Sequence, residues 1–212
     1  MTRGAPLFEP SPPQGRADRA ALTQVLEAHG AARFVAWDLG EADLSDLDLA
    51  GCVFARCRAG HASFASADLT EARFEACDLN NTAWRGARLA AAHLVDCKLT
   101  GAQFREVSAL GLTFARCLLV NVYLRGVSFR KAECEALDLQ GADLAGCDFR
   151  EAVLSDCNLR DAHLTDARFE AADLRGADLG DLRLSDAARF RGAFISKAQA
   201  AQLLIGLGLK VV

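Results

Sequence analysis

A bulky apolar residue occurs at every fifth position through most of this chain of 212 residues. Steps of five from Phe34 to Leu184 define 31 positions, of which 28 hold Leu, Phe or Trp. An α-helix places apolar residues about 3.6 positions apart and a strand places them two apart, so neither element can continue through this pattern. The backbone must therefore bend after each step.

The residue two positions before each bulky one is mostly small and apolar, being Ala at 15 of the 31 positions and Cys at 7. Residues two apart in an extended segment point to the same side, so we expect both to face inward while the residue between them, often Asp, faces water. The other two residues of each step then turn a corner. Repetition of this unit predicts a solenoid whose short straight sides stack about 4.8 Å apart.

The cysteines indicate how many sides each coil has. Five of the eight recur at intervals of four pentads or a multiple of that interval: Cys57, Cys77, Cys97, Cys117 and Cys157. A coil of four pentads has four sides, one for each pentad. The sequence therefore predicts an all-β solenoid in which residues 31–195 form about eight four-sided coils.

Each end of a solenoid exposes a face that no further coil covers, so we expect a cap at each end. Near the amino end, apolar residues at helical spacing lie between Asp18, a suitable N-cap, and Gly30, a helix stop. We predict a capping helix within residues 16–30. Residues 1–15 contain all four prolines and are expected to be a flexible arm.

At the other end the register slips by one residue after Leu184, because the next bulky positions are Phe190 and Ile195. Ser196 can cap a helix in "SKAQAAQLLIGLG", so residues 196–212 are predicted to contain a helix and a short extended segment. One face of this helix must cover the last coil. The apolar residues that remain favour a dimer contact, and the alternative is a cap with no further partner.

No feature of the sequence predicts catalysis or a bound cofactor. The four histidines fall in different columns of the repeat, and no nucleophile-elbow, zinc-protease, phosphate-loop or dinucleotide motif is present. The inward cysteines could bind a metal or form disulfides, but no Cys-x-x-Cys pair occurs and small apolar filler is the preferred interpretation. We expect no enzyme activity, no metal and no cofactor.

Charge and hydropathy limit the partners. A net charge of −4 argues against broad capture of nucleic acid. No apolar run is long enough to span a bilayer, and the opening "MTRGAPLFEPSPPQG" lacks the apolar stretch of a secretory signal. We expect a cytoplasmic protein that binds neither membranes nor nucleic acid directly and whose partner has a basic surface.

With a structural interior, function must lie on the outer surface or at the ends. The side that contains Leu39 and its equivalents in the later coils has the most negative charge. Its carboxylates, here called the acidic face, are Asp38, Glu41, Asp78, Asp138, Asp161, Asp178 and Asp181. They could imitate a phosphate backbone, although duplex DNA carries one charge per about 1.7 Å and this side is far sparser. The alternative is a solvated face that keeps the protein soluble.

Outward apolar residues are concentrated in one stretch of the repeat: Leu110, Leu118, Val120 and Tyr123. A cluster of this kind would serve as a contact patch for a partner. Isolated exposed apolar residues are also common on protein surfaces, so simple tolerance is the alternative.

The repeated pattern itself resembles a known family. The pentads "ADLSD", "CDLNN", "ADLAG", "ADLRG" and "ADLGD" are similar to those of pentapeptide-repeat proteins, and the pattern covers residues 32–184 without an inserted loop. The resemblance implies that family's right-handed quadrilateral β-helix, in agreement with the cysteine column that repeats every four pentads.

Three further stretches are similar to the Qnr-type branch, pentapeptide proteins that protect DNA gyrase and topoisomerase IV from quinolones. They are "SALGLTFARC" at 108–117, "LGDLRL" at 179–184 and the ending "QAAQLLIGLGLKVV". The resemblance implies a homodimer joined through C-terminal helices and an acidic, DNA-like surface that engages the topoisomerase. The residues expected at the dimer contact are Ala200, Leu203, Leu204, Leu207, Leu209 and Val211.

One departure from that branch concerns loops. Many Qnr-type proteins protect gyrase through loops that project from the coils, and the unbroken register from 34 to 184 leaves no place for them. Loop-free gyrase-binding relatives are therefore the closer comparison. The alternative function is a structural or scaffolding pentapeptide-repeat protein that binds another protein partner.

Overall fold

The computed structural model describes residues 6–180, 188–206 and 208–211. Its contacts divide the chain into two compact units, residues 1–112 and 113–212, which are described separately below. Among the described residues, no helix has the length and apolarity needed to cross a bilayer.

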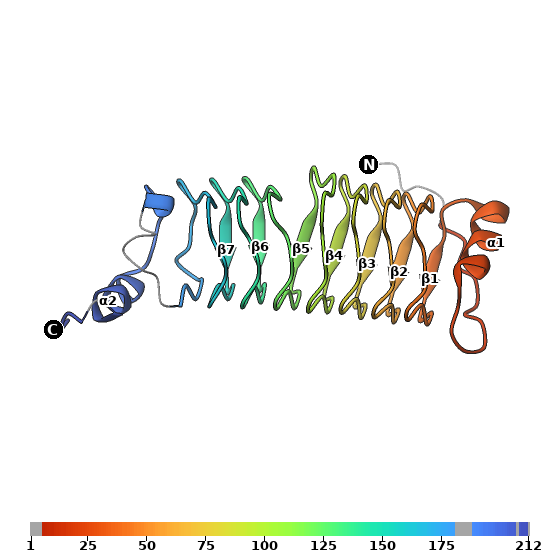
Figure 1. Ribbon diagram of the computed structural model, residues 1–212, viewed down its shortest axis with the longest axis horizontal. Helices are drawn as coiled ribbons and strands as arrows, with labels where there is room; N and C mark the ends of the chain where they lie inside the picture. The colour runs from red at the N-terminus through yellow and green to blue at the C-terminus, as the bar shows by residue number, and fades with distance from the viewer. Residues whose placement is uncertain (1–5, 181–187, 207, 212) are drawn as a thin grey trace. The chain divides into compact units, whose positions relative to one another are not determined.

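The first unit contains one helix and a parallel sheet. Helix α1 spans Arg19–His29, and the strands that follow are β1 (Arg33–Val35), β2 (Val53–Ala55), β3 (Arg73–Glu75) and β4 (His93–Val95). The three pairings are parallel and join residues four pentads apart, so Phe34, Phe54, Phe74 and Leu94 lie directly above one another. Figure 1 shows these strands in successive coils.

The second unit repeats the arrangement. Strands β5 (Thr113–Ala115), β6 (Glu133–Glu135) and β7 (Val153–Ser155) are followed by helix α2, Lys197–Gly206. Parallel pairing joins β5 to β6 and β6 to β7, again between residues four pentads apart.

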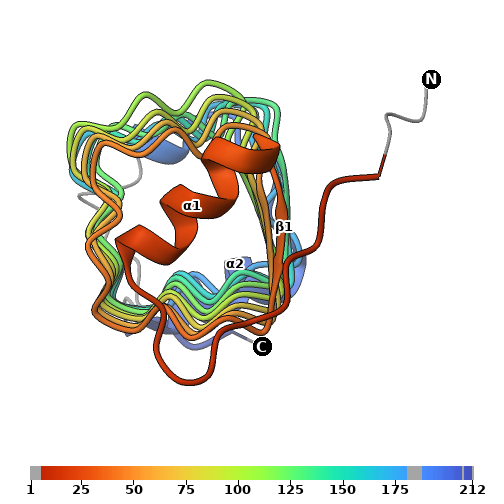
Figure 2. The same cartoon turned by 90° about the vertical axis from the view of Figure 1, so that its right-hand side faces the viewer.

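The other three sides of each coil are too short to be strands but pair in the same way. Isolated parallel bridges join equivalent residues of successive coils, as from Asp48 to Asp68 and from Asp138 to Asn158. The backbone N–H of Asp68 donates to the Leu47 carbonyl oxygen at 2.9 Å, and the N–H of Leu49 donates to the Asp68 oxygen at 2.7 Å. The coil is four-sided in cross-section (Figure 2), which confirms the predicted solenoid.

The corners between sides require an unusual backbone conformation. The last residue of most pentads has a positive φ, between 48° at Ala136 and 62° at His61 for residues other than glycine. This left-handed region is unfavourable for residues with a Cβ atom. Hydrogen bonds to the next coil hold the corner; for example, the N–H of His61 donates to the Asn80 oxygen at 2.9 Å.

The interior holds the two apolar columns that the repeat predicts. In the first unit the rings of Phe54 and Phe74 stack at 4.9 Å between centroids, and Phe64 and Trp84 stack at 4.3 Å. The second unit contains one aromatic ladder, formed by Phe129, Phe149, Phe169 and Phe190 with centroids 4.7–4.8 Å apart. All of these except Phe190 are at most 3% exposed, so the columns are the core.

The N-terminal cap consists of a helix and a paired segment. Asp18 is the N-cap of α1 and its carboxylate accepts the Ala21 N–H at 3.0 Å, while Leu22 is fully buried beneath the helix. The residues before the helix also pair with the first coil: the N–H of Arg33 donates to the Phe8 oxygen at 2.8 Å. Pro10 is buried, and its carbonyl oxygen accepts a hydrogen bond from the Trp37 indole at 3.4 Å. Phe8 and Pro10 thus contact the first coil, and the flexibility expected over residues 1–15 stays a prediction.

The C-terminal cap begins with the predicted slip in register. Asp173 pairs with Phe194, one position beyond the Ala193 that the regular repeat would place there. Ser196 then caps α2 reciprocally: its hydroxyl accepts the Gln199 N–H at 3.2 Å, and its own N–H donates to the Gln199 side chain at 2.6 Å. The Gln199 amide also donates to the carbonyl oxygens of Leu174 and Ala177, both at 2.7 Å. Gln199 therefore ties the helix to the last coil.

Candidate partner-binding surfaces

Three of the buried cysteines, Cys134, Cys147 and Cys157, lie in a setting that keeps their thiols protonated. All eight are free and buried. Burial raises the pKa of the Cys134 and Cys147 thiols to about 12 and that of Cys157 to about 11. The thiol, not the thiolate, is then the form present at neutral pH, which makes these side chains poor nucleophiles and metal ligands. Within the described ranges, no group of three or more His, Cys, Asp or Glu side chains is placed to hold a metal ion.

In the first unit the acidic face is electrically balanced. One column on this side alternates in sign from coil to coil, because parallel bridges connect Arg16, Asp38, Arg58, Asp78 and Lys98 in that order. An Arg58 guanidinium nitrogen lies 2.9 Å from an Asp38 carboxylate oxygen. The carboxylates of this side therefore alternate with cations in the first unit.

Arg16 contributes to this charge balance, although the repeat pattern does not predict that it does. It precedes the first pentad, yet the segment that contains it pairs with the first coil, and the Ala17 N–H donates to the Asp38 oxygen at 2.6 Å. The Arg16 guanidinium lies 3.3 Å from the Glu41 carboxylate. Three carboxylates, Asp38, Glu41 and Asp78, thus share the side with three cations.

In the second unit the same side remains acidic. Asp138, Asn158 and Asp178 occupy successive coils of one column, and Asp161 lies at the adjoining corner. Arg160 is the one cation at the described positions of this side, and its guanidinium is 2.6 Å from the Asp178 carboxylate. Three carboxylates here face one guanidinium. Asp181 lies outside the described residues.

Local hydrogen bonds orient these carboxylates. Asp138 accepts the Asn158 side-chain amide at 2.9 Å and the Gln140 N–H at 3.2 Å. The Gly180 N–H, 3.0 Å from Asp178, and the nearby Arg160 lower the pKa of the Asp178 carboxyl despite its partial burial. The side chain of Asp178 is still 46% exposed, so a partner can reach the charge.

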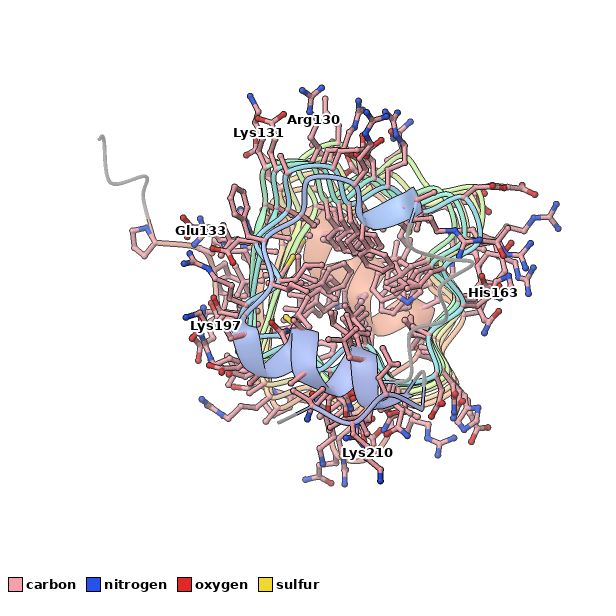
Figure 3. All side chains as sticks on the ribbon, turned by 90° about the vertical axis from the view of Figure 1, so that its left-hand side faces the viewer. Arg130, Lys131, Glu133, His163, Lys197 and Lys210 are labelled. Atoms are coloured by element: carbon pink, nitrogen blue, oxygen red, sulfur yellow. The ribbon has the colours of Figure 1, made fainter. Side chains whose placement is uncertain are left out.

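One corner of the second unit carries the basic side chains of Arg130 and Lys131. Arg130 and Lys131 project outward from the coil (Figure 3), and both contact the Glu151 carboxylate, at 2.9 and 3.5 Å. These pairs are exposed, and exposed ion pairs contribute little to stability.

The outward apolar stretch belongs to both units. Leu110, in the first unit, is 83% exposed, the largest exposed fraction among the exposed large apolar side chains described. Leu118, in the second unit, is 45% exposed, whereas Val120 and Tyr123 are half-buried. Leu118 pairs with Asp138 through a backbone bridge, so it occupies the same column as Asp138 in the preceding coil. The Arg125 guanidinium lies 5.4 Å from the centroid of the Tyr123 ring.

The C-terminal end presents a second apolar surface. Helix α2 runs along one edge of the coil, beginning near Lys197 (Figure 3). Its Ala200 and Leu203 side chains are half-buried, whereas several other residues at this end are exposed. The exposed large apolar side chains, here called the C-terminal apolar patch, are Phe194, Ile195, Leu204, Ile205, Leu209 and Val211. Leu207 lies outside the described residues.

Two family models match the chain over most of its length. One, described as a pentapeptide repeat region, matches residues 31–104. The other, described as pentapeptide repeats in 8 copies, matches residues 111–144, 142–181 and 162–200. A comparison with curated protein sequences found no match.

Solved structures of QnrB1, a plasmid-mediated fluoroquinolone resistance protein, are similar to this chain. One trypsin-treated variant has a TM-score of 0.76 and 25% identity, covering 85% of this chain and 90% of that one. A second trypsin-treated variant has a TM-score of 0.68 and 26% identity, covering 85% and 88%. The full-length protein has a TM-score of 0.67 and 24% identity, covering 84% and 88%. The repeat, the four-sided coil and the two family models together show that this chain belongs to the pentapeptide-repeat family.

Proposed function

We propose that this protein is a non-enzymatic, cytoplasmic, Qnr-type protein that binds DNA gyrase or topoisomerase IV and modulates it or protects it from quinolones or another topoisomerase poison. The observation that carries the proposal is the similarity to QnrB1, a fluoroquinolone resistance protein, at a TM-score of 0.76 over 85% of this chain. No cofactor is required, because the proposed action is binding through a charged surface.

The second unit supplies the proposed contact with the topoisomerase. Asp138, Asp161 and Asp178 form a partly exposed acidic surface that lacks the balancing cations of the first unit. A DNA-binding enzyme has a basic channel, and a negative surface is attracted to it and competes there with DNA. Stacked coils place Asp138 and Asp178 about 10 Å apart, which is sparser than DNA phosphates, so the contact imitates DNA only in part.

The C-terminal apolar patch supports a homodimer. Several large apolar side chains gather at one end, with Ile205 58% exposed and Leu209 54% exposed. Exposed apolar side chains grouped at one end of a protein are typical of interfaces between proteins. A second copy that uses the same patch would form a closed two-fold contact.

The balanced first unit favours a second candidate function. Its alternating column gives no net attraction for a basic channel, so a protein that acts only through this unit would be a scaffold for another protein partner. That function predicts no effect on any topoisomerase.

A cleavage assay distinguishes the two functions. Purified gyrase, supercoiled DNA and a fluoroquinolone are mixed with increasing amounts of this protein, and the linear DNA released from the drug-stabilised complex is measured. Protection predicts less linear DNA as the protein concentration rises, together with direct binding to the enzyme. If the protein neither binds gyrase or topoisomerase IV nor changes cleavage or supercoiling, the proposed function is wrong.

A further inference from the structure

The N-terminal segment covers only part of the first coil. The coil exposes an edge of backbone groups on each of its four sides, because no earlier coil pairs with them. The chain covers two of these edges itself: the Arg33 N–H donates to Phe8, and the Asp38 oxygen accepts from Ala17. Figure 2 shows the segment before α1 running along β1 and the adjoining side.

The other two edges, at Asp43 and Asp48, have no such cover. The second coil bonds to the residues on either side of Asp48, namely Leu47 and Leu49, so the backbone groups of Asp48 itself point away from that coil. Among the described residues, the N–H and C=O groups of Asp43 and Asp48 have no hydrogen-bond partner. At Asp43 the guanidinium of Arg19 reaches over the edge and donates to the Ser45 oxygen. Arg19 thus covers part of the edge at Asp43, whereas no described side chain donates to the backbone of the edge at Asp48.

A cleft of about 340 Å³ lies at this open edge, between the second half of α1 and the coil. Its lining includes Leu26 and Glu27 of α1 and Leu47, Asp48 and Ala50 of the coil. The half-buried Leu26 supplies an apolar wall, while the exposed Glu27 and Asp48 supply two carboxylates. No lysine or arginine lines the cleft, so its charge is negative.

The covered edge beside it shows which kind of chain fits such a position. There an extended segment bonds to Arg33 through its backbone, places Phe8 against the α1 residue His29 with ring centroids 3.6 Å apart, and pairs Glu9 with Arg33 at 3.7 Å. Backbone pairing, an apolar contact with α1 and an ion pair therefore occur together. At the open edge the same three contacts are available, with the charge reversed.

We propose that the cleft between α1 and the Leu47–Ala50 side of the first coil binds an extended, cationic segment of a partner polypeptide. The segment adds backbone pairing to Asp48, places an apolar side chain against Leu26, and directs Lys or Arg toward Glu27 and Asp48. Addition of a strand to an exposed edge is a common mode of peptide recognition, in which main-chain bonds give affinity and neighbouring side chains give specificity.

A titration of the full isotope-labelled protein with a short peptide tests this proposal. The probe is acetyl-Gly-Leu-Lys-Val-Lys-Gly-amide, and its matched controls carry Glu in place of both Lys residues or N-methyl groups on alternate backbone amides. The proposal predicts amide shifts at Asp48–Gly51 and at the end of α1 with the cationic peptide alone. No shift at millimolar peptide, or equal binding of either control, would overturn it.

Two protein variants complete the test. Glu27→Gln with Asp48→Asn removes both charges, while an asparagine oxygen can still accept the Ala50 N–H that Asp48 accepts at 3.1 Å. Peptide affinity is expected to fall about tenfold. Asp78 accepts the Asn80 N–H at 3.2 Å in the same kind of turn, but on another side of the coil. The control variant Asp78→Asn should therefore leave the peptide affinity unchanged. Equal peptide affinity of the wild type and both variants would contradict a peptide site. Amide shifts in the cleft that depend on protein concentration in the absence of peptide would also contradict it, because they would indicate that a second copy of the protein binds there.

Discussion

The two units are built from the same pentad, yet they use their surfaces and ends differently. In the first unit, the side with the acidic face alternates carboxylates with cations from coil to coil, and a helix with the buried Leu22 lies over the end together with a paired segment. In the second unit, that side keeps unbalanced carboxylates, and the terminal helix is tied down by one polar side chain while apolar residues remain exposed. The same fold can therefore balance the charge of a side in one part of a chain and leave it unbalanced in another.

The apolar N-terminal cap is expected to give the largest effect on stability. Leu22 is fully buried between α1 and the first coil. Leu22→Ala removes this contact and leaves a cavity, which is expected to cost about 2–5 kcal/mol. The free energy of unfolding from urea denaturation measures it. Val25→Ala, at a half-buried position on the same helix, is the control and should cost less.

The C-terminal apolar patch is tested through the oligomeric state. Leu204→Glu with Ile205→Glu places charges on side chains that are 42% and 58% exposed, so folding should be preserved while dimerisation weakens at least about 100-fold, or about 3 kcal/mol. Sedimentation equilibrium measures the association. Leu118→Glu, at a side chain of similar exposure, is the control. A wild-type monomer, or a double variant that dimerises normally, would show that the patch is not the interface.

The polar C-terminal cap is expected to have a smaller effect than the apolar one. Gln199→Ala removes two hydrogen bonds to the carbonyl oxygens of Leu174 and Ala177, and it removes the side-chain acceptor of the Ser196 N–H. A loss of about 1–3 kcal/mol is expected, because buried carbonyl groups then lack donors. Hydrogen exchange should quicken in α2 while that of α1 is unchanged. Equal protection of α2 in the wild type and the variant would rule out this role of Gln199.

The smallest expected effect is on acid stability, where the two units should behave alike. Asp68 is partly buried, but hydrogen bonds from Thr70 and Arg88 outweigh burial and lower the pKa of its carboxyl. The Arg150 side chain, 2.6 Å away, lowers the pKa of the Asp148 carboxyl. A lowered folded-state pKa stabilises the fold above the unfolded value of about 3.9, and this contribution is lost as pH falls through the folded-state pKa.

Asp68→Asn and Asp148→Asn should therefore each reduce the loss of unfolding free energy between neutral and acidic pH, by less than about 1 kcal/mol. Urea denaturation between neutral pH and pH of about 3 measures the slope. An unchanged slope in both variants would show that these pairs do not contribute to acid stability.

The sequence predicts the repeating part of this molecule well and the added segments poorly. The inward columns, the N-cap at Asp18 and the slip before Phe194 follow from local spacing and from helix capping, and the structure contains each of them. Arg16 and Gln199 act across coils from outside the repeat, where no period assigns them a column. Their partners are set by how the ends of the chain fold back, so the contribution of Arg16 to the charge balance of the first unit was not predictable from the spacing of the pentads.

The most direct test of the proposed acidic contact compares matched charge variants in the gyrase cleavage assay. One variant neutralises the second unit with Asp138→Asn, Asp161→Asn and Asp178→Asn, and the other neutralises the first unit with Asp38→Asn, Glu41→Gln and Asp78→Asn. We expect the second-unit variant to need at least about tenfold more protein for the same protection, because it loses its steering charge, while the first-unit variant protects like the wild type. Equal protection by both variants would contradict the assignment of the contact to the second unit.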